Sequence, residues 1–185
     1  MTLTKIADEL WLKYIPRRCE SKNLKAWNEH INLQYAWVRS LDVQQRPRDP
    51  ELYAVILEPR QHPHLEFVIR NVLSFLGPDW GLQILHGTRN AQFVHNIVKG
   101  WKNVELTNLQ ADNLRPRAYN KMKASLWLWD QIKGRKVLWF EPDAMLLRPG
   151  IEEFLDYDYV GAPWATGKRA LAGWVAHILR SSQAE

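Results

Sequence analysis

The sequence predicts an α/β fold with a mostly parallel sheet, helices on both faces of the sheet, and a helical extension at the N-terminus. From residue 51 onward, short apolar runs rich in β-forming residues alternate with longer segments whose apolar residues have helical spacing. Such alternation is typical of βαβ units, in which neighbouring strands run parallel. Polar and charged residues also follow several of the apolar runs directly, which is where open α/β sheets bind ligands.

Residues 1–50 are predicted to form the helical extension and a linker. Apolar spacing typical of amphipathic helices covers residues 3–14 and 23–41. Residues 46–50 contain two prolines among charged side chains, a composition that ends a helix. This region shows no chemical motif, and we expect it to pack on the following domain or to tether it.

Residues 51–164 contain the predicted sheet. The expected strands are 53–57, 80–86, 104–109 and 137–140, and the expected helices are 65–76, 90–98 and 119–132. Glycines follow the first helix at Gly77, the second at Gly100 and the third at Gly134, as is common at helix ends. A short helix or turn at 150–155 and a last short strand at 158–162 complete the pattern.

The composition is that of a soluble globular domain. The chain has 185 residues, of which 46% are hydrophobic and 24% charged. A single cysteine, Cys19, excludes an intramolecular disulfide and a cysteine-based zinc site. Ten tryptophans are unusual for this length and could fill the core or stack against sugars or bases; composition alone favours the core.

Charge and hydropathy narrow the choice of partner and compartment. The net charge of +5 suits an anionic ligand but is too diffuse to indicate nucleic acid. No stretch approaches the roughly 18 apolar residues of a transmembrane segment, and acids interrupt the apolar residues of 1–12, unlike a signal peptide. We therefore expect a cytoplasmic protein, or one of the secretory pathway if the N-terminus is incomplete.

Glu141-Pro142-Asp143 is the most informative motif. It follows the apolar run 137–140 and places two carboxylates one residue apart. On extended backbone such a pair can point the same way and share a divalent cation that also contacts phosphate oxygens. Pro142 makes the turn stiff. The alternative is a pair of solvated loop acids, one of them paired with Arg148.

Two further loops at strand ends carry candidate phosphate contacts. Glu58 and Arg60 follow the first strand, and Arg89 follows the second, just after Gly87, which allows close approach of the backbone to a ligand. The second loop could equally be an ordinary β–α turn. His62 and His64 have the spacing of a metal pair, but Pro63 between them and the lack of a third ligand nearby favour a loop surface.

A basic segment precedes and enters the third helix. It could form an electrostatic rim for a nucleotide diphosphate or a polyanion, although a solvated helix face is the more common meaning of such a run; its cations are Arg115, Arg117, Lys121 and Lys123. The sequence contains no phosphate-binding loop and no dinucleotide fingerprint. It also lacks the Gly-x-Ser-x-Gly sequence of one hydrolase class.

Residues 53–164 resemble an uncharacterised glycosyltransferase-like domain family that is widespread in fungi and is expected to share the GT-A fold. The resemblance is carried, in the family's order, by 54–60, 62–71, 75–83, 86–87, 112–114, 119–120, 143 with 146–151, and 153–164. The most specific segment is Tyr157-Asp-Tyr-Val-Gly-Ala-Pro-Trp164.

The resemblance implies a nucleotide sugar lying across the carboxyl ends of the sheet, with an unknown glycan, protein or small molecule as acceptor. The Asp-x-Asp-type motif of this fold falls on Glu141-Pro142-Asp143. Asp143 is the safer ligand for Mn²⁺ or Mg²⁺ and Glu141 the weaker one, because the family often has an amide at that position. The cation would neutralise the leaving diphosphate. Residues 58–60 would contact the nucleotide, and Arg60 and Arg89 would help to bind phosphate.

The resemblance ends after Trp164. The family continues with several dozen residues that include a Gly-Asn-Gly-Gly-rich segment expected to line the acceptor site, whereas only residues 165–185 follow here. We therefore interpret 51–164 as an incomplete nucleotide-sugar-binding domain and 165–185 as a divergent C-terminal tail. We assign no catalytic base, His177 included.

Four functions remain open from the sequence. A metal-dependent glycosyltransferase, or its nucleotide-sugar-binding half, is favoured, and an inactive binding or scaffold module is the alternative. A glycoside hydrolase is weakly supported, because its two carboxyls usually lie on separate elements at roughly 5–9 Å. A nucleic-acid binder would depend only on the positive charge.

Overall fold

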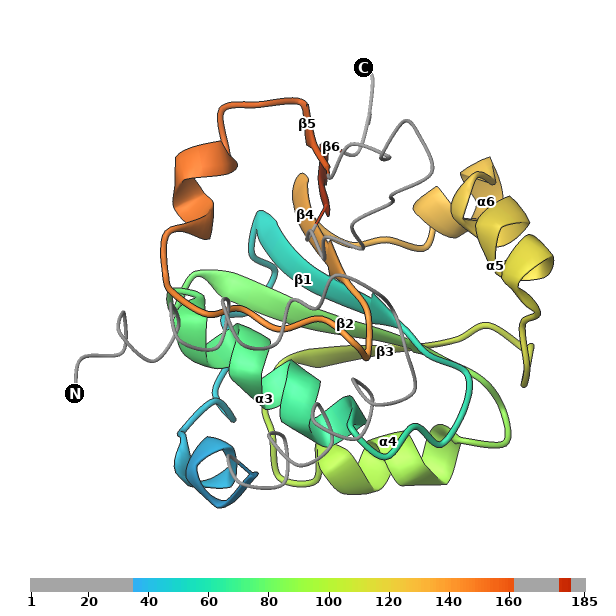
Figure 1. Cartoon of the computed structure of the whole chain (residues 1–185), viewed down its shortest axis with the longest axis horizontal. Helices are drawn as coiled ribbons and strands as arrows, with labels where there is room; N and C mark the ends of the chain where they lie inside the picture. The colour runs from blue at the N-terminus through green and yellow to red at the C-terminus, as the bar shows by residue number, and fades with distance from the viewer. Residues whose placement is uncertain (1–34, 162–176, 181–185) are drawn as a thin grey trace, which may run out of the picture.

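The computed structural model describes residues 35–161 and 177–180 (Figure 1). The predicted helix at 3–14, most of that at 23–41, and the Gly-Ala-Pro-Trp segment beyond residue 161 lie outside the described residues. Helical backbone is observed over residues 35–40. No helix in the described ranges is long and apolar enough to cross a membrane.

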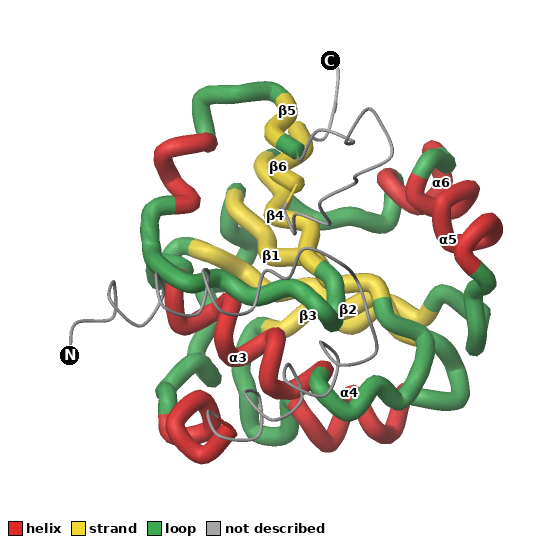
Figure 2. The backbone as a smooth tube through the Cα atoms, in the orientation of Figure 1, coloured by secondary structure: helices red, strands yellow, loops and turns green. Residues whose placement is uncertain are grey.

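The centre of the fold is a sheet whose first four strands, β3, β2, β1 and β4, are parallel. The next strand, β6, pairs antiparallel with both β4 and β5 (Figure 2). In sheet order the described strands are β3 (Val104–Asn108), β2 (Trp80–His86), β1 (Leu52–Leu57), β4 (Lys136–Phe140), β6 (His177–Arg180) and β5 (Tyr159–Val160). The predicted mostly parallel sheet is confirmed.

Helices connect the parallel strands as the alternation predicted. The described helices are α3 (Leu65–Phe75), α4 (Ala91–Ile97), α5 (Pro116–Lys123), α6 (Leu126–Trp129) and the short 3₁₀ helix η1 (Ile151–Phe154). α3 lies between β1 and β2 in the chain, α4 between β2 and β3, and α5 with α6 between β3 and β4.

The sheet is covered on both faces, because successive strand residues point to opposite sides. Ala54 and Ile56 of β1 pack with α3, α4 and Val38 on one face. Val55 of β1 and Trp139 of β4 pack with α6 and the half-buried face of α5 on the other. The helical layer on each face agrees with the prediction and fixes the strands between two apolar cores.

The predicted helix over 119–132 is wrong in its extent. The structure has two short helices there, because the chain leaves the helical path at Ala124 and begins again at Ser125. Ser125 has extended backbone, and its Oγ accepts a hydrogen bond from the Leu128 N–H at 3.3 Å. A serine that caps a new helix competes with continuation of the old one.

Strand β6 was not expected from the sequence. The segment 165–185 is predicted to be a tail outside the domain, but its residues 177–180 lie in the sheet between β4 and β5. This pairing depends on contacts between segments far apart in the chain, which local periodicity cannot show.

Candidate functional site

The candidate site lies where the carboxyl ends of β1 and β4 meet. In the order β3-β2-β1-β4, the chain leaves β1 toward β2 on one side, whereas β4 joins β1 on the other side. Loops after neighbouring strands of this kind diverge and leave a crevice at the sheet edge, where open α/β sheets bind ligands. Glu58 follows β1 directly and Glu141 follows β4 directly.

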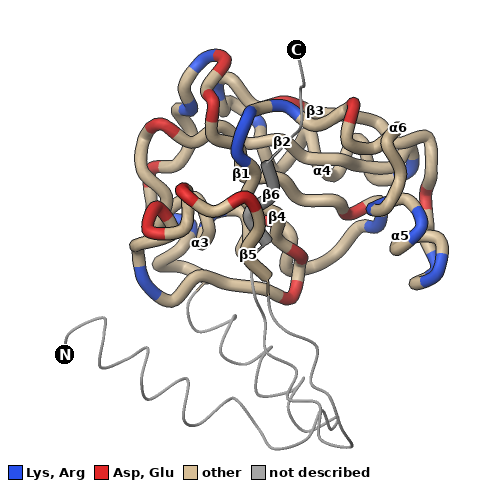
Figure 3. Tube along the Cα trace, turned by 90° about the horizontal axis from the view of Figure 1, so that it is seen from above, with Lys and Arg blue, Asp and Glu red and all other residues tan. Residues whose placement is uncertain are grey.

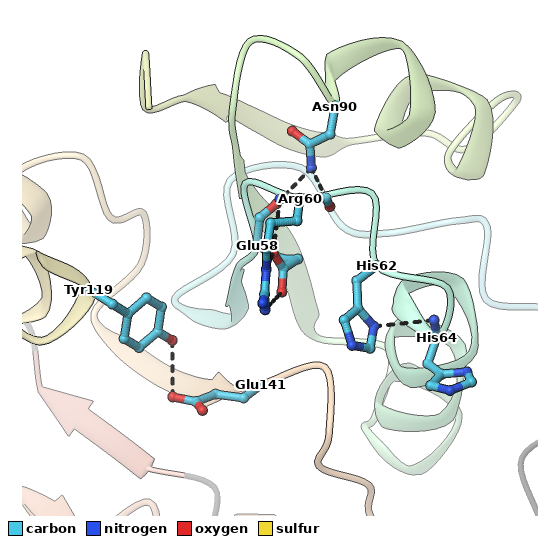
Figure 4. A network of polar contacts seen from close by, with 7 residues as sticks. All are labelled: Glu58, Arg60, His62, His64, Asn90, Tyr119 and Glu141. Carbon is cyan, nitrogen blue, oxygen red and sulfur yellow. Dashed lines mark hydrogen bonds and ion pairs between the residues drawn. The ribbon is translucent and has the colours of Figure 1, made fainter. Parts of the chain in front are cut away.

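Glu58 is a buried carboxylate held by Arg60. The Glu58 side chain is 2% exposed and that of Arg60 60% exposed. One Glu58 oxygen accepts from the Arg60 backbone N–H at 2.9 Å and from Nε at 2.8 Å, and the other accepts from Nη2 at 2.7 Å. Such a two-pronged ion pair compensates the buried charge. It also fixes the orientation of the guanidinium, whose Nη1 makes no bond among the described residues (Figure 4).

Asn90 ties the loops after β1 and β2 together. Its Nδ2 donates to the carbonyl oxygens of Glu58 at 2.8 Å and Arg60 at 2.9 Å (Figure 4). Its Oδ1 accepts from the Gly87 N–H at 2.8 Å. Asn90 is 1% exposed. A buried amide with three such bonds keeps the loop that carries Arg60 in one position.

Gly87 lies where the loops after β1, β2 and β3 meet. A Cβ at this position would be 2.5 Å from the Ala111 carbonyl oxygen and 2.9 Å from that of Pro59. Only glycine permits this approach of three backbones. The glycine therefore has a packing role, and the expectation that a ligand approaches the backbone there remains a prediction.

Arg89 is paired with Asp112 in the loop after β3. Its backbone N–H donates to Asp112 Oδ1 at 2.7 Å, and its Nε lies 3.4 Å from Asp112 Oδ2. The Arg89 side chain is 87% exposed. Arg89 thus lies beside the loop after β3, and among the described residues it forms no hydrogen bond or ion pair with Glu58 or Glu141.

Glu141 is joined to the helical layer. Its Oε1 accepts from the Tyr119 hydroxyl at 3.0 Å (Figure 4). The same oxygen accepts from Lys123 Nζ at 3.1 Å. Lys123 Nζ also lies 5.1 Å from the centre of the Trp139 ring. Burial, and after it the charge of Glu141, raises the pKa of the Tyr119 hydroxyl well above its ordinary value, so Tyr119 remains a hydrogen-bond donor at physiological pH.

Asp143 lies two residues further on and is exposed. Partial desolvation of its carboxyl and then the charge of Glu141 raise its pKa, and Glu58 acts in the same direction. Its own backbone hydrogen bond and the charge of Arg60 oppose the shift. The charges of Glu58, at the end of β1, and of Glu141, at the end of β4, thus both act on the Asp143 carboxyl.

The fit to a divalent cation is partial. Glu141 and Asp143 supply the hard oxygen ligands that Mg²⁺ and Mn²⁺ accept. No group of three or more His, Cys, Asp or Glu residues arranged for a metal occurs in the part of the chain that is described. Lys123 also occupies Oε1 of Glu141. The pair therefore suits a cation that receives its other ligands from water and from a bound phosphate.

The loop that carries Asp143 is anchored to α3. Asn71 in α3 donates through Nδ2 to the Leu146 carbonyl at 3.1 Å, and its Oδ1 accepts from the Leu146 N–H at 2.8 Å. Asn71 is 3% exposed. Its buried amide restricts the backbone between β4 and η1.

The two histidines after β1 form a local pair. The His64 N–H donates to His62 Nδ1 at 3.3 Å, and the ring centres are 5.6 Å apart (Figure 4). Burial lowers the pKa of both imidazoles. They belong to no three-residue metal group in the described ranges.

No motif in the sequence indicates a role in the site for Asn90, Asn71 or Tyr119. Tyr119 and Lys123 are four residues apart, the spacing at which two side chains share one helix face. That spacing could have shown that they act together. Nothing in the sequence shows that Glu141 is their partner, because this contact is set by how α5 packs on the sheet.

One family model and several solved structures are similar to this chain. The family described as "Protein of unknown function (DUF5672)" matches residues 103–183, less than half of the chain. No curated protein matches the chain. A structure of S. aureus TarS 1–349 in complex with UDP is similar at 15% identity and a TM-score of 0.41, over 71% of this chain and 47% of that one. The apo-form glycosyltransferase GlyE of Streptococcus pneumoniae TIGR4 is similar at 10% identity and a TM-score of 0.40, over 71% of this chain and 34% of that one. This chain thus spans less than half the length of either structure.

Proposed function

We propose that the crevice at the carboxyl ends of β1 and β4 binds a nucleotide sugar, and that the protein is a glycosyltransferase-like enzyme acting on an acceptor yet to be identified. The observation that carries the proposal is the meeting of Glu58, Glu141 and Asp143 with Arg60 at the switch point of a parallel sheet. Acids that hold a cation, beside a guanidinium that contacts phosphate, form the set of groups that a diphosphate requires.

Each group has a separate role in this proposal. Asp143, assisted by Glu141, would hold Mn²⁺ or Mg²⁺, whose charge would stabilise the departing diphosphate. Arg60 would donate from Nη1 to a phosphate oxygen while Glu58 keeps the guanidinium in place. Arg89 would contribute a weaker, long-range attraction, because it is solvent-exposed and paired with Asp112.

The test is ligand-dependent thermal stabilisation. A nucleoside diphosphate with Mn²⁺ should raise the melting temperature of the protein, because a ligand that binds only the folded state stabilises it. At about 100 times its Kd the ligand adds about 2.7 kcal/mol, or roughly 5–10 °C for a chain of this size. Asp143→Asn should abolish most of the part that depends on Mn²⁺, and Arg60→Gln should weaken binding with and without the metal.

The matched control is Asp79→Asn. Asp79 is exposed and comes just before β2, so it lies at the edge of the parallel sheet opposite to the candidate site. It should keep the full ligand-induced shift. The proposal is wrong if a panel of nucleoside diphosphates with Mn²⁺ leaves the wild-type melting temperature unchanged, or if Asp143→Asn and Asp79→Asn behave alike.

A nucleotide-sugar-binding module without transfer activity is the second candidate. It is favoured by the Lys123–Glu141 ion pair, since Lys123 Nζ competes with a metal for Oε1. Measurement of product from a panel of nucleotide-sugar donors separates the two candidates. Detectable transfer would exclude the inactive module, whereas binding without transfer across the panel would favour it.

A further inference from the structure

Helix α6 carries more apolar surface than the fold uses. All four of its residues, Leu126-Trp-Leu-Trp129, are apolar. Leu128 is fully buried, and the Trp129 ring lies 5.9 Å from that of Trp139. Leu126 is 82% exposed and Trp127 is 50% exposed. At about 100° per residue, the first two positions of the helix face away from the last two, so one half of α6 packs and the other half faces solvent.

The outward half of α6 is held in that orientation. Ser125 caps the helix by accepting from the Leu128 N–H, and Trp129 Nε1 donates to the Lys123 carbonyl at 2.8 Å. If α6 rotated to bury Leu126, Leu128 would have to leave the core. Two adjacent large apolar side chains are therefore presented to solvent by a fixed support, unlike a single exposed leucine, which is ordinary.

The segment that carries this apolar pair is rich in exposed cations. Between residues 115 and 135 the only acid is Asp130. The exposed cations of this segment are Arg115, Arg117, Lys121, Lys133 and Arg135. Basic positions mark α5 at the periphery of the molecule (Figure 3). We call the exposed pair and these cations the α5–α6 surface.

We propose that the α5–α6 surface docks the protein on an anionic lipid surface, with Leu126 and Trp127 entering the headgroup region. Leucine and tryptophan beside arginine and lysine are the composition of interfacial helices, in which apolar insertion and attraction to anionic headgroups add together. The occupant is inferred from charge complementarity and does not depend on the nucleotide-sugar site.

Two other occupants fit the surface less well. Single-stranded nucleic acid would use the cations and Trp127, but an exposed leucine offers no face on which a base can stack. A second copy of the chain would bring like-charged segments together, at a cost that the small apolar pair does not offset. A lipid surface uses every group of the α5–α6 surface.

Docking in this way would also orient the candidate site. Lys123 belongs to α5, the helix that carries part of the α5–α6 surface. Its Nζ donates a hydrogen bond to Glu141 at the end of β4. The candidate site and the α5–α6 surface therefore share α5, which would fix the distance of the site from the membrane.

The experiment is co-sedimentation of the full chain with phosphatidylcholine vesicles made with and without phosphatidylserine. We expect binding to the anionic vesicles, weak binding to the neutral ones, and a steep decrease in binding as salt is added. Leu126→Ser with Trp127→Ser should lower the partition coefficient about tenfold or more, because two inserted side chains are lost. Arg117→Gln with Lys121→Gln should lower it by a similar factor and flatten the salt dependence.

Matched controls change the same residue types elsewhere. Trp37→Ser removes another exposed tryptophan, and Arg48→Gln with Lys99→Gln removes two exposed cations outside the α5–α6 surface. These variants should bind as wild type. Melting temperatures check that each variant is folded, and the wild-type comparison of the two vesicle types needs no variant at all.

Several outcomes would overturn the proposal. One is equal partition of the wild type to neutral and anionic vesicles, or no partition to either. Another is an equal loss of binding in the control variants. Light scattering that shows a dimer dissociated by Leu126→Ser would assign the surface to a second copy, and tight binding of single-stranded oligonucleotides with no vesicle binding would assign it to nucleic acid.

Discussion

Asp143 combines the two properties expected of a binding residue, which are exposure and electrostatic strain. Its carboxyl is accessible, yet partial desolvation and the neighbouring acids disfavour its charged form. Functional residues are often held at a cost in stability in this way. Its proposed role as the main metal ligand remains a prediction, and its electrostatics can be tested without any ligand.

Asp143→Asn should stabilise the ligand-free protein at neutral pH. Because the folded-state pKa of Asp143 is raised above the ordinary 3.8, the folded protein binds more protons than the unfolded chain in the interval above 3.8. The contribution of this group to stability therefore falls as the pH rises through that interval, and it stays low at neutral pH. Solvent screening limits the gain to well under 1 kcal/mol, or about 1–2 °C in melting temperature.

Thermal melts across the acid to neutral range measure this effect. The gain from Asp143→Asn should be present at neutral pH and should vanish below 3.8, where the aspartate is protonated in both states. Asp79→Asn, an exposed position, should change the melting temperature little at any pH. A loss of stability in Asp143→Asn at neutral pH would contradict the electrostatic account.

At the scale of elements, the site is made rigid by contacts between loops rather than within them. Asn90 joins the loops after β1 and β2, and Asn71 joins α3 to the loop after β4. Gly87 permits the loops after β1, β2 and β3 to lie in contact. The three strand ends thus behave as one packed unit.

Gly87→Ala should destabilise the protein by about 2–3 kcal/mol, since overpacking against backbone cannot be relieved by moving a side chain. The new Cβ would lie 2.5 Å from the Ala111 carbonyl oxygen. Gly77→Ala is the matched control, because nothing lies within 4 Å of a Cβ there. Urea unfolding of both variants measures the difference, and equal midpoints for the two would refute the close packing at Gly87.

For the whole molecule, the parallel sheet makes stability uneven from its centre to its edges. β1 lies between β2 and β4, and five of its six positions are buried. β3 is half-buried, and β5 has two residues at the opposite edge. The candidate site uses the ends of the central strands β1 and β4, where the backbone is best fixed.

Hydrogen exchange should therefore divide the sheet into a protected centre and labile edges. Amides of β1 should exchange only through global unfolding, while those of β3 and β5 should exchange through local openings that are faster by orders of magnitude. Exchange measured by mass spectrometry on peptides that cover each strand tests this order. Protection of β5 equal to that of β1 would contradict this order, because the whole sheet would then open only as one unit.

The sequence by itself determined the α/β class and the order along the chain of the segments that form the parallel strands. It also placed the acids Glu58, Glu141 and Asp143 at strand ends. These features are local, because the periodicity of apolar residues reports the face that each segment buries. The family resemblance added the nucleotide-sugar hypothesis, which the structure leaves as a proposal.

Only the tertiary structure decided which side chains meet. The sequence did not show the break between α5 and α6, the pairing of β6 with β4, or the bonds from Tyr119 and Lys123 to Glu141. Each of these depends on how elements distant in the chain pack together, and such packing leaves no periodic signal in the residues themselves. For the same reason, the exposed half of α6 is visible only once its other half is seen buried against β4.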